Sequence, residues 1–418
     1  MAEQTLALTL PAAEVLAALA ARTGGDAAVR RTALADLAAG EPPHRADHLW
    51  RFTDPAVLLP ADWETALAGG AGEEPGDEPV ATDYAGTVVL RPGTGPLVRL
   101  SPAARDAGVT AGPLGGDDPV PGGDDGFFPL LNAAAWNAGA RLDIPAGTRL
   151  ALPLRVVVPA APLLLPRLVV TVGAGAEVTL LEDHRGDTGH VLGVGRLAVA
   201  AGAAVRHLIL QRWGDGVTGY LHRHARVARD AGLLTAFAAL GGGRAKQEIT
   251  AELAGPGADS RMIGVALADG DDRHLDLHTR HRHEAPRTTS DIDYRTVAAG
   301  RARASYTGLI RIAEEARGSS AFQENRNLLL SDRARVDSIP ELEILNEDVS
   351  CSHGATVAPV DPAQRFYLES RGLAPDAAVR LIVGGFLEPT LARLPGAVRP
   401  DIDRLVADRL AAWTEVAS

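Results

Sequence analysis

The stretch Arg167–Asp183, RLVVTVGAGAEVTLLED, places two short β-favouring runs on either side of a Gly-Ala-Gly-Ala turn. Similar small-residue turns follow at Ala201–Ala203, Asp230–Gly232, Gly255–Ala258, Gly300–Ala302 and Asp332–Ala334. Most are roughly 26–30 residues apart, and a self-similar period in this range indicates stacked structural units. The intervals hold too little helix for βαβ units. We therefore predict a mainly β protein with a right-handed parallel β-helix core, and a β-sandwich is the alternative.

Helical patterns flank this predicted core. Before it, the region from about Pro11 to Gly40 has helical periodicity. After it, Asp361 can cap a helix that has Pro362 at its first position. The predicted division is an N-terminal helical region with loops over residues 1–126, a β-helix over 127–359 and a C-terminal helical domain over 360–418. Helices that follow the last turn are expected to cover the open end of the β-helix, because exposed strand edges invite aggregation.

Composition narrows the class of protein. Of 418 residues 46% are hydrophobic, which argues against disorder throughout, and the net charge is −12. An acidic chain is a poor binder of nucleic acid or of an anionic membrane surface. No apolar run approaches the ~20 residues of a membrane span, and the first charge of the chain is acidic rather than basic. One cysteine forms no internal disulfide, so we predict a cytoplasmic protein.

Three pairs of residues could carry chemistry, each with two residues that share a face of a strand. His281 and His283 could present two imidazoles to a metal, but the signal is weak and a solvated polar face is the favoured interpretation. Asp291 and Asp293 could act in polysaccharide cleavage or form surface salt bridges. No ATP-binding P-loop of the form G-x-x-x-x-G-K-[ST] occurs.

The third pair is Cys351 and His353, within the stretch CSHGAT. On a strand the two side chains point the same way, about 6.5–7 Å apart. They could be a nucleophile with its base, a structural thiol beside an imidazole, or two metal ligands. Two donors are half of a tetrahedral shell. If this pair binds a metal or a cluster, a second chain must therefore complete the site.

The region around this pair resembles a known family. Residues Ser320–Phe386 contain, in order, LLLS, P-x-L-E-I, D-V-x-C-S-H-G-A-T-V, Y-L-x-S-R-G and G-F. These motifs are similar to the C-terminal core of the SufB/SufD family of iron–sulfur cluster assembly proteins. FFPLLNAAAWNAGARLDIPAGT (Phe127–Thr148) and LWRFTDP (Leu49–Pro55) resemble earlier parts of the family.

The resemblance implies a non-catalytic scaffold subunit that pairs with a SufB-like protein through its β-helix. It also implies that a SufC-like P-loop ATPase docks on the C-terminal helices, with Tyr367, Arg371, Phe386 and Glu388 as candidate contacts. His353 and Cys351 match the family's interface pair. We expect no tightly bound cofactor, only iron or a transient iron–sulfur cluster shared with the partner chain. The isolated chain is also expected to be able to form a homodimer.

Within the family the SufD branch is favoured over the SufB branch. The length is SufD-like, and SufB members usually carry a further cysteine in the β-helix that this chain lacks. GFLEP (Gly385–Pro389) is, in contrast, similar to the SufB ending. The alternatives of another class are a β-helix carbohydrate-active enzyme, which the 4% aromatic content disfavours, and a cysteine-dependent enzyme at Cys351.

Overall fold

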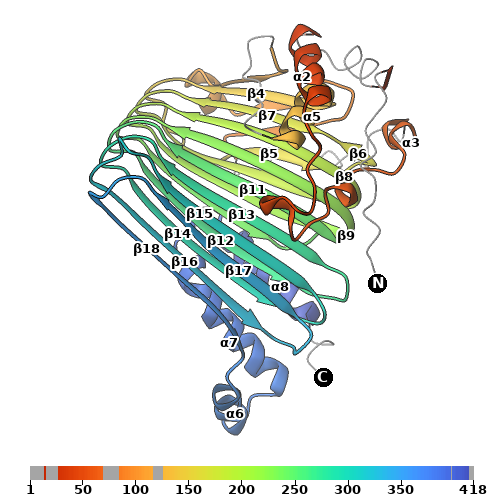
Figure 1. Cartoon of the computed structure of the whole chain (residues 1–418), viewed down its shortest axis with the longest axis vertical. Coiled ribbons are helices and arrows are strands. Elements are labelled where there is room, and N and C mark those ends of the chain that lie inside the picture. Colours follow the sequence, from red (N-terminus) through yellow and green to blue (C-terminus); the bar gives the residue numbers. More distant parts are fainter. Residues whose placement is uncertain (1–13, 16–26, 69–83, 116–125, 397, 414–418) are drawn as a thin grey trace.

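The computed structural model describes residues 14–15, 27–68, 84–115, 126–396 and 398–413. Within these residues the chain winds into a parallel β-solenoid with helices before and after it (Figure 1). The predicted mainly β architecture is thus confirmed, and the sandwich alternative is wrong, because successive turns pair in parallel. In the described ranges no helix combines the length and apolar character needed to cross a bilayer.

Two sheets form the walls of the solenoid. Sheet I contains β5, the first halves of β8 and β9, then β10, β12, β14, β16 and β18. Sheet II contains β4, β7, the second halves of β8 and β9, then β11, β13, β15 and β17. The strands are β1 (Gly86–Val89), β2 (Leu97–Leu100), β3 (Thr110–Gly112), β4 (Ala138–Ile144), β5 (Leu154–Pro159), β6 (Leu163–Leu164), β7 (Pro166–Val172), β8 (Glu177–Val199), β9 (Ala204–Val227), β10 (Gly232–Ala239), β11 (Arg244–Leu253), β12 (Asp259–Ala268), β13 (His274–His283), β14 (Thr289–Ala298), β15 (Arg303–Ile312), β16 (Ser319–Leu329), β17 (Arg335–Ile344) and β18 (Val349–Pro359).

One corner of the solenoid repeats the same backbone conformation turn after turn. Where a sheet II strand leads into the next sheet I strand, one residue has a positive φ: Gly147, Gly175, Gly202, Asp230, Gly257, Arg287 and Gly318. The backbone N–H of each donates to a carbonyl of the following turn, for example Gly175 to Ala201 (3.0 Å) and Arg287 to Arg317 (2.9 Å). Glycine adopts this conformation at little cost. Four of the small-residue turns that predicted the solenoid mark this corner, whereas Gly300–Ala302 and Asp332–Ala334 lie at the opposite corner, between β14 and β15 and between β16 and β17.

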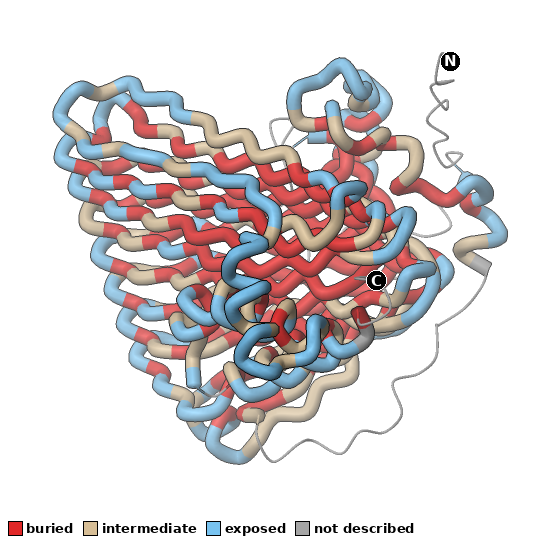
Figure 2. Tube along the Cα trace, turned by 90° about the horizontal axis from the view of Figure 1, so that it is seen from below, coloured by how far each residue is buried: buried red, intermediate tan, exposed pale blue. Residues whose placement is uncertain are grey.

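The interior between the sheets is filled by inward-facing side chains of both walls. Apolar residues dominate, and Tyr294 and Tyr306 are fully buried with their ring centroids 4.9 Å apart. In Figure 2 the buried residues form the inner part of the stacked turns, while the corners are exposed. At the N-terminal end, β1–β3 and α4 (Pro102–Asp106) close the solenoid, since Val88, Ala104 and Val109 join the interior core.

The N-terminal helices and loops cover the outer face of sheet II. The elements are α2 (Ala27–Ala39), η1 (His48–Trp50), η2 (Pro55–Leu58), α3 (Trp63–Ala68) and α5 (Phe127–Ala135). The Trp50 ring stacks against both Phe128 and Tyr220, with ring centroids 5.0 and 6.1 Å away, and so joins the segment to both α5 and the sheet. Part of the region predicted to be helical from about Pro11 to Gly40, residues 11–13 and 16–26, lies outside the described residues.

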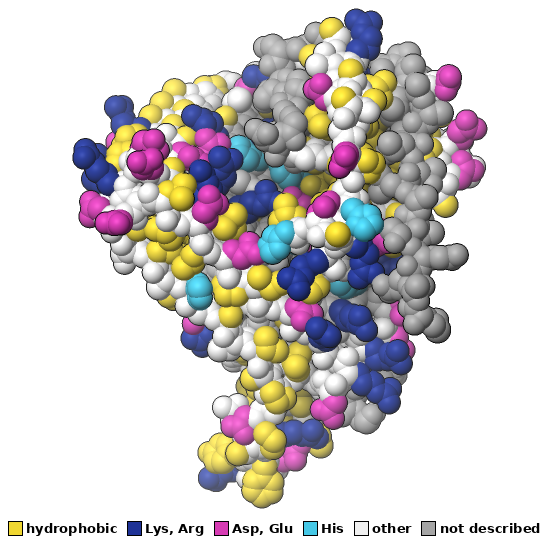
Figure 3. Space-filling model, in the orientation of Figure 1, with side chains coloured by type: hydrophobic (Ala, Val, Ile, Leu, Met, Phe, Trp, Pro, Cys, Tyr) yellow, Lys and Arg dark blue, Asp and Glu magenta, His cyan; other side chains and the backbone are white. Residues whose placement is uncertain are grey.

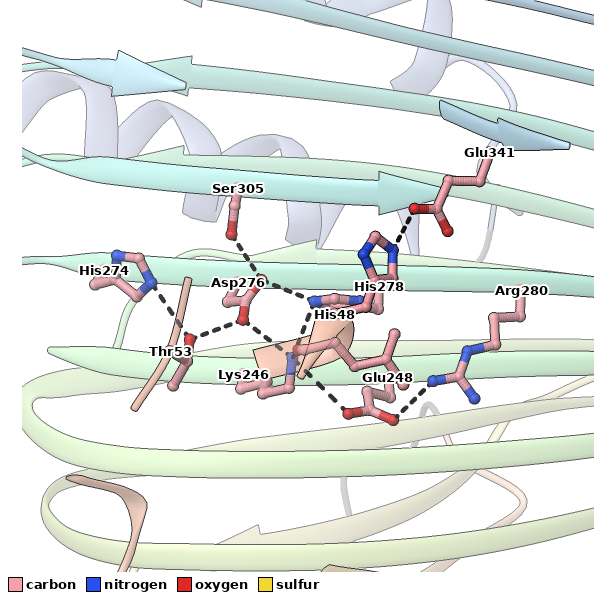
Figure 4. A network of polar contacts seen from close by, with 11 residues as sticks. His48, Thr53, Lys246, Glu248, His274, Asp276, His278, Arg280, Ser305 and Glu341 are labelled. Carbon is pink, nitrogen blue, oxygen red and sulfur yellow. Dashed lines mark hydrogen bonds and ion pairs between the residues drawn. The ribbon is translucent and has the colours of Figure 1, made fainter. Parts of the chain in front are cut away.

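We call residues 48–58 the strap, because they lie across charged side chains of sheet II (Figure 4). The fully buried Lys246 ammonium donates to the Leu49 carbonyl (2.6 Å) and to Asp276 (3.0 Å), with the Trp50 ring centroid 4.7 Å away. Thr53 of the strap donates to Asp276 as well (2.7 Å). Burial alone would raise the pKa of Asp276, but Lys246 and the hydrogen bonds hold that pKa well below its ordinary value.

Of the three C-terminal helices, the second and third lie across the outer face of sheet I, whereas the first projects beyond it and has no buried residue (Figure 1). They are α6 (Pro362–Ser370), α7 (Pro375–Leu391) and α8 (Arg399–Ala412), and Asp361 caps α6 as predicted by accepting from the Ala363 N–H (2.8 Å). Val383 and Leu387 of α7 pack with Ile263 and other apolar residues on the outside of sheet I. The prediction that these helices close the end of the solenoid is wrong, because their apolar side chains pack on the outer face of sheet I while Leu342 and Ile344 of the last turn stay exposed.

The strap cluster leads to a stability prediction. Replacing Lys246 with Met removes the counter-charge of the buried Asp276, so we expect the free energy of unfolding to fall by about 3–5 kcal/mol. The matched control is Lys246→Met combined with Asp276→Asn, which removes both charges and should cost less than the sum of the two single changes. Urea unfolding measures both. If the losses in unfolding free energy of the two single variants add up to that of the double variant, Lys246 and Asp276 do not stabilise each other.

Candidate functional site

Within the described residues, the last turn of the solenoid is left uncovered. Strands β17 and β18 each pair with the strand of the preceding turn, and the described part of the chain supplies no strand beyond them. Leu342 and Ile344 continue the interior positions of Ile310 and Ile312, yet both are exposed. Leu345, which follows β17, is 50% exposed. The interior core of the protein therefore reaches the surface at this end.

Cys351 and His353 lie in this last turn, on the side of β18 that continues the interior face. Cys351 stands in register with Ala321 of β16 and packs on the edge of the core, and His353 stands in register with Gln323 and is exposed. No hydrogen bond joins the thiol to the imidazole in the part of the chain that the structure describes. Partial burial raises the pKa of Cys351. The geometry thus offers a soft sulfur donor and an accessible imidazole on one open surface, without an activated nucleophile.

A second exposed surface lies at the tip formed by α6, where apolar side chains gather in Figure 3. Phe366 is 72% exposed, Tyr367 is 56% exposed, and the Arg371 guanidinium lies 5.2 Å from the Tyr367 ring centroid. We call these three residues the tip patch. Sequence reasoning singled out Tyr367 and Arg371 but missed Phe366, which is adjacent and more exposed.

The other two candidate docking residues lie differently. Phe386 is half-buried, with the Arg295 guanidinium 5.5 Å from its ring centroid. Glu388 accepts two hydrogen bonds from Arg399 (2.7 and 2.8 Å). Both residues are therefore engaged within the chain, and the tip patch does not include them.

The other two predicted pairs of site residues, His281 with His283 and Asp291 with Asp293, contact other residues of the same chain. His281 and His283 are buried inside the solenoid, where Ser260 lies 2.9 Å from His281 and Ser290 lies 2.8 Å from His283. Burial lowers the pKa of His281 to about 3 and that of His283 to about 4, so both rings are neutral at pH 7. Among the described residues no group of three or more metal-binding side chains forms a site. The expected solvated face is also wrong, because neither ring is exposed.

Asp291 and Asp293 hold the C-terminal helices against sheet I. Arg393, just after α7, pairs with both carboxylates, and Thr390 donates to Asp293 (2.9 Å). Arg295 also lies beside Asp293 (3.5 Å). These contacts match the salt-bridge interpretation, and helix α7 covers the face on which a polysaccharide would have to lie.

The protein is thus a parallel β-solenoid with an open last turn. Comparison with known proteins identifies its family. Residues 157–386 match the SUF system FeS cluster assembly SufBD core domain. This match spans more than half of the chain. The protein belongs to the SufBD family of iron–sulfur cluster assembly proteins.

Curated relatives agree with this assignment. A SufBD family protein of Mycobacterium tuberculosis is 28% identical over 385 residues, 89% of each chain. Another SufBD family protein, from Mycobacterium bovis, is 33% identical over 204 residues, which are 49% of this chain but 24% of that much longer relative. The iron–sulfur cluster assembly protein SufB of Bacillus subtilis is 27% identical over 297 residues, 68% of this chain and 62% of that protein.

The state of Cys351 leads to a test of thiol chemistry. Because its pKa is raised, we expect iodoacetamide to alkylate Cys351 at pH 7.5 more slowly than a free thiol, with the rate rising only at more alkaline pH. The His353→Ala variant serves as the control and should show the same pH profile. Rapid alkylation at neutral pH that His353→Ala abolishes would instead reveal an activated cysteine–histidine pair.

Proposed function

We propose that this chain is the SufD-like, non-catalytic subunit of a SUF scaffold and that its open last turn pairs with a SufB-like subunit. The observation that carries the proposal is the uncovered end formed by β17 and β18. Unpaired strand edges and exposed core residues are unfavourable in a free chain and call for a covering partner. A parallel solenoid of the same family supplies the matching strand edges.

The donor count at this end supports a shared cluster site. Cys351 and His353 provide two donors, whereas an iron–sulfur cluster usually requires four. Both side chains face the surface at which the partner would pair. A cluster or iron held jointly by two chains, as substrate of the assembly, is therefore bound only in the complex and can be passed on.

Three features favour the SufD-like role over a SufB-like one. The chain has one cysteine, at the end of the solenoid, and hence no thiol in its interior. Its relative in Mycobacterium tuberculosis matches over nearly the whole length of both chains, whereas SufB of Bacillus subtilis matches over less of its own length. The raised pKa of Cys351 further supports a subunit that does not itself activate sulfur.

The tip patch is the proposed docking surface for a SufC-like P-loop ATPase. Its aromatic residues are the types that dominate the energy of protein interfaces, and they stand on α6 at the end of the molecule away from the N-terminal helices (Figure 1). Arg371 adds a positive charge beside Tyr367. ATP hydrolysis would thus be supplied by the partner and act on the scaffold through α6 and α7.

The pairing proposal predicts separate effects of two substitutions. Leu345→Asp places a charge in the apolar end and should abolish co-purification with the SufB-like subunit, while Leu152→Asp, at a 41% exposed site in the loop before β5, should not. His353→Ala should keep pairing intact but lower the iron and sulfide bound per complex. A His353→Ala complex with the wild-type cluster content would remove His353 from the site.

The docking proposal predicts loss of ATPase binding from a single change in the tip patch. Phe366→Asp should weaken binding by at least about 2 kcal/mol, or roughly 30-fold, because a central exposed aromatic residue is removed. Isothermal titration with the purified ATPase measures the affinity, and Leu152→Asp is again the control. Equal affinities of wild type and Phe366→Asp would exclude the tip patch as the docking surface.

A further inference from the structure

A polar layer lies one turn inside the open end. On β16 three consecutive inward positions are Gln323, Asn325 and Asn327, all buried. In the turn before, the residues in register with the first two are Ile292 and Tyr294. Asn325 and Asn327 bond to each other (2.6 Å), and Asn327 donates to the Thr356 carbonyl (3.0 Å). These two asparagines thus have structural roles.

Gln323 differs from its neighbours. Its side chain is fully buried, and neither its amide nitrogen nor its amide oxygen has a hydrogen-bond partner among the described residues. Leaving a buried polar group unpaired costs about 1–3 kcal/mol. The apolar Ile292 and Met262 occupy the same column one and two turns further in, so an apolar side chain suits this position. The amide therefore calls for a partner that appears in another state of the protein.

The position of Gln323 identifies that partner. Gln323 stands directly beneath His353 in the strand register, and neighbouring strands lie about 4.8 Å apart. Side chains on these two strands reach across the gap, as Asn327 does to Thr356 (3.0 Å). The Gln323 amide now lies over Gly308 of β15, since a β-carbon at Gly308 would come within 2.4–2.8 Å of its atoms.

We propose that Gln323 is a positioning residue for His353. In the paired assembly its amide oxygen accepts the hydrogen bond of one imidazole N–H, which fixes the tautomer and directs the other ring nitrogen at the bound iron. Ligating histidines generally donate their second N–H in this way, and loss of such a partner typically weakens metal binding 10–100-fold. The inference rests on the proposed function, because it takes His353 to be a ligand at the shared site.

The test uses the purified complex with the SufB-like subunit and Co²⁺ as a spectroscopic probe. Gln323→Met keeps the side-chain length and removes the amide, and we expect about 10-fold weaker Co²⁺ binding. In a His353→Ala background Gln323→Met should have no further effect, which a merely structural role would not predict. Selective ¹⁵N-histidine spectra of the complex should show one tautomer of His353 in the wild type and a mixture in Gln323→Met.

A second variant covers the case in which Gln323→Met does not fold. Gln323→Ile places in this column the side chain that Ile292 carries one turn further in, and it should mix the His353 tautomers in the same way as Gln323→Met. If His353→Ala binds Co²⁺ as the wild type does, the proposed function fails. If His353→Ala loses binding while Gln323→Met or Gln323→Ile retains the wild-type affinity and tautomer, only the role of Gln323 is refuted.

Discussion

The corner ladder of left-handed residues is the constraint on which the rest of the structure depends. From Gly147 to Gly318 each turn reverses at a residue with positive φ, and its N–H bonds to the next turn. This contact fixes the height of one turn over another and, with it, the register of both sheets. The register places Cys351 over Ala321 and His353 over Gln323, so the geometry of the open end follows from a backbone pattern laid down many turns earlier.

Much of this pattern could be predicted from the sequence, because glycine adopts a positive φ at little cost and so indicates where such a turn can form. The turns at Gly175, Gly202 and Gly257 were recognised for this reason, and Asp230 is of a residue type that tolerates the same conformation. Arg287 gave no such signal, since an arginine with φ of 56° is held by its surroundings rather than by its own preference. The helix cap at Asp361 was equally local and equally predictable.

Contacts between residues far apart in the chain could not be predicted from the sequence. The strap cluster joins Thr53, Lys246 and Asp276 from distant segments, and no local pattern marks any of them. The course of α7 across sheet I depends on apolar residues from several turns, among them Leu208, Ile263 and Val297, which only the assembled sheet brings together. Likewise the pairing of His281 with Ser260 arises from register, and a pair of histidines two residues apart indicated only that they share a face. The resemblance of motifs located Cys351 and His353, but only the structure shows that no hydrogen bond joins their side chains.

The two ends of the solenoid are finished differently, with β1–β3 and α4 at one end and bare strands at the other. Because of this asymmetry, further strands could be added to the solenoid only at the end formed by β17 and β18. In the scaffold proposed above, a surplus of this subunit would leave apolar strand edges open to pairing with other extended chains. The proposed pairing therefore implies that the two subunits have to be made in balanced amounts.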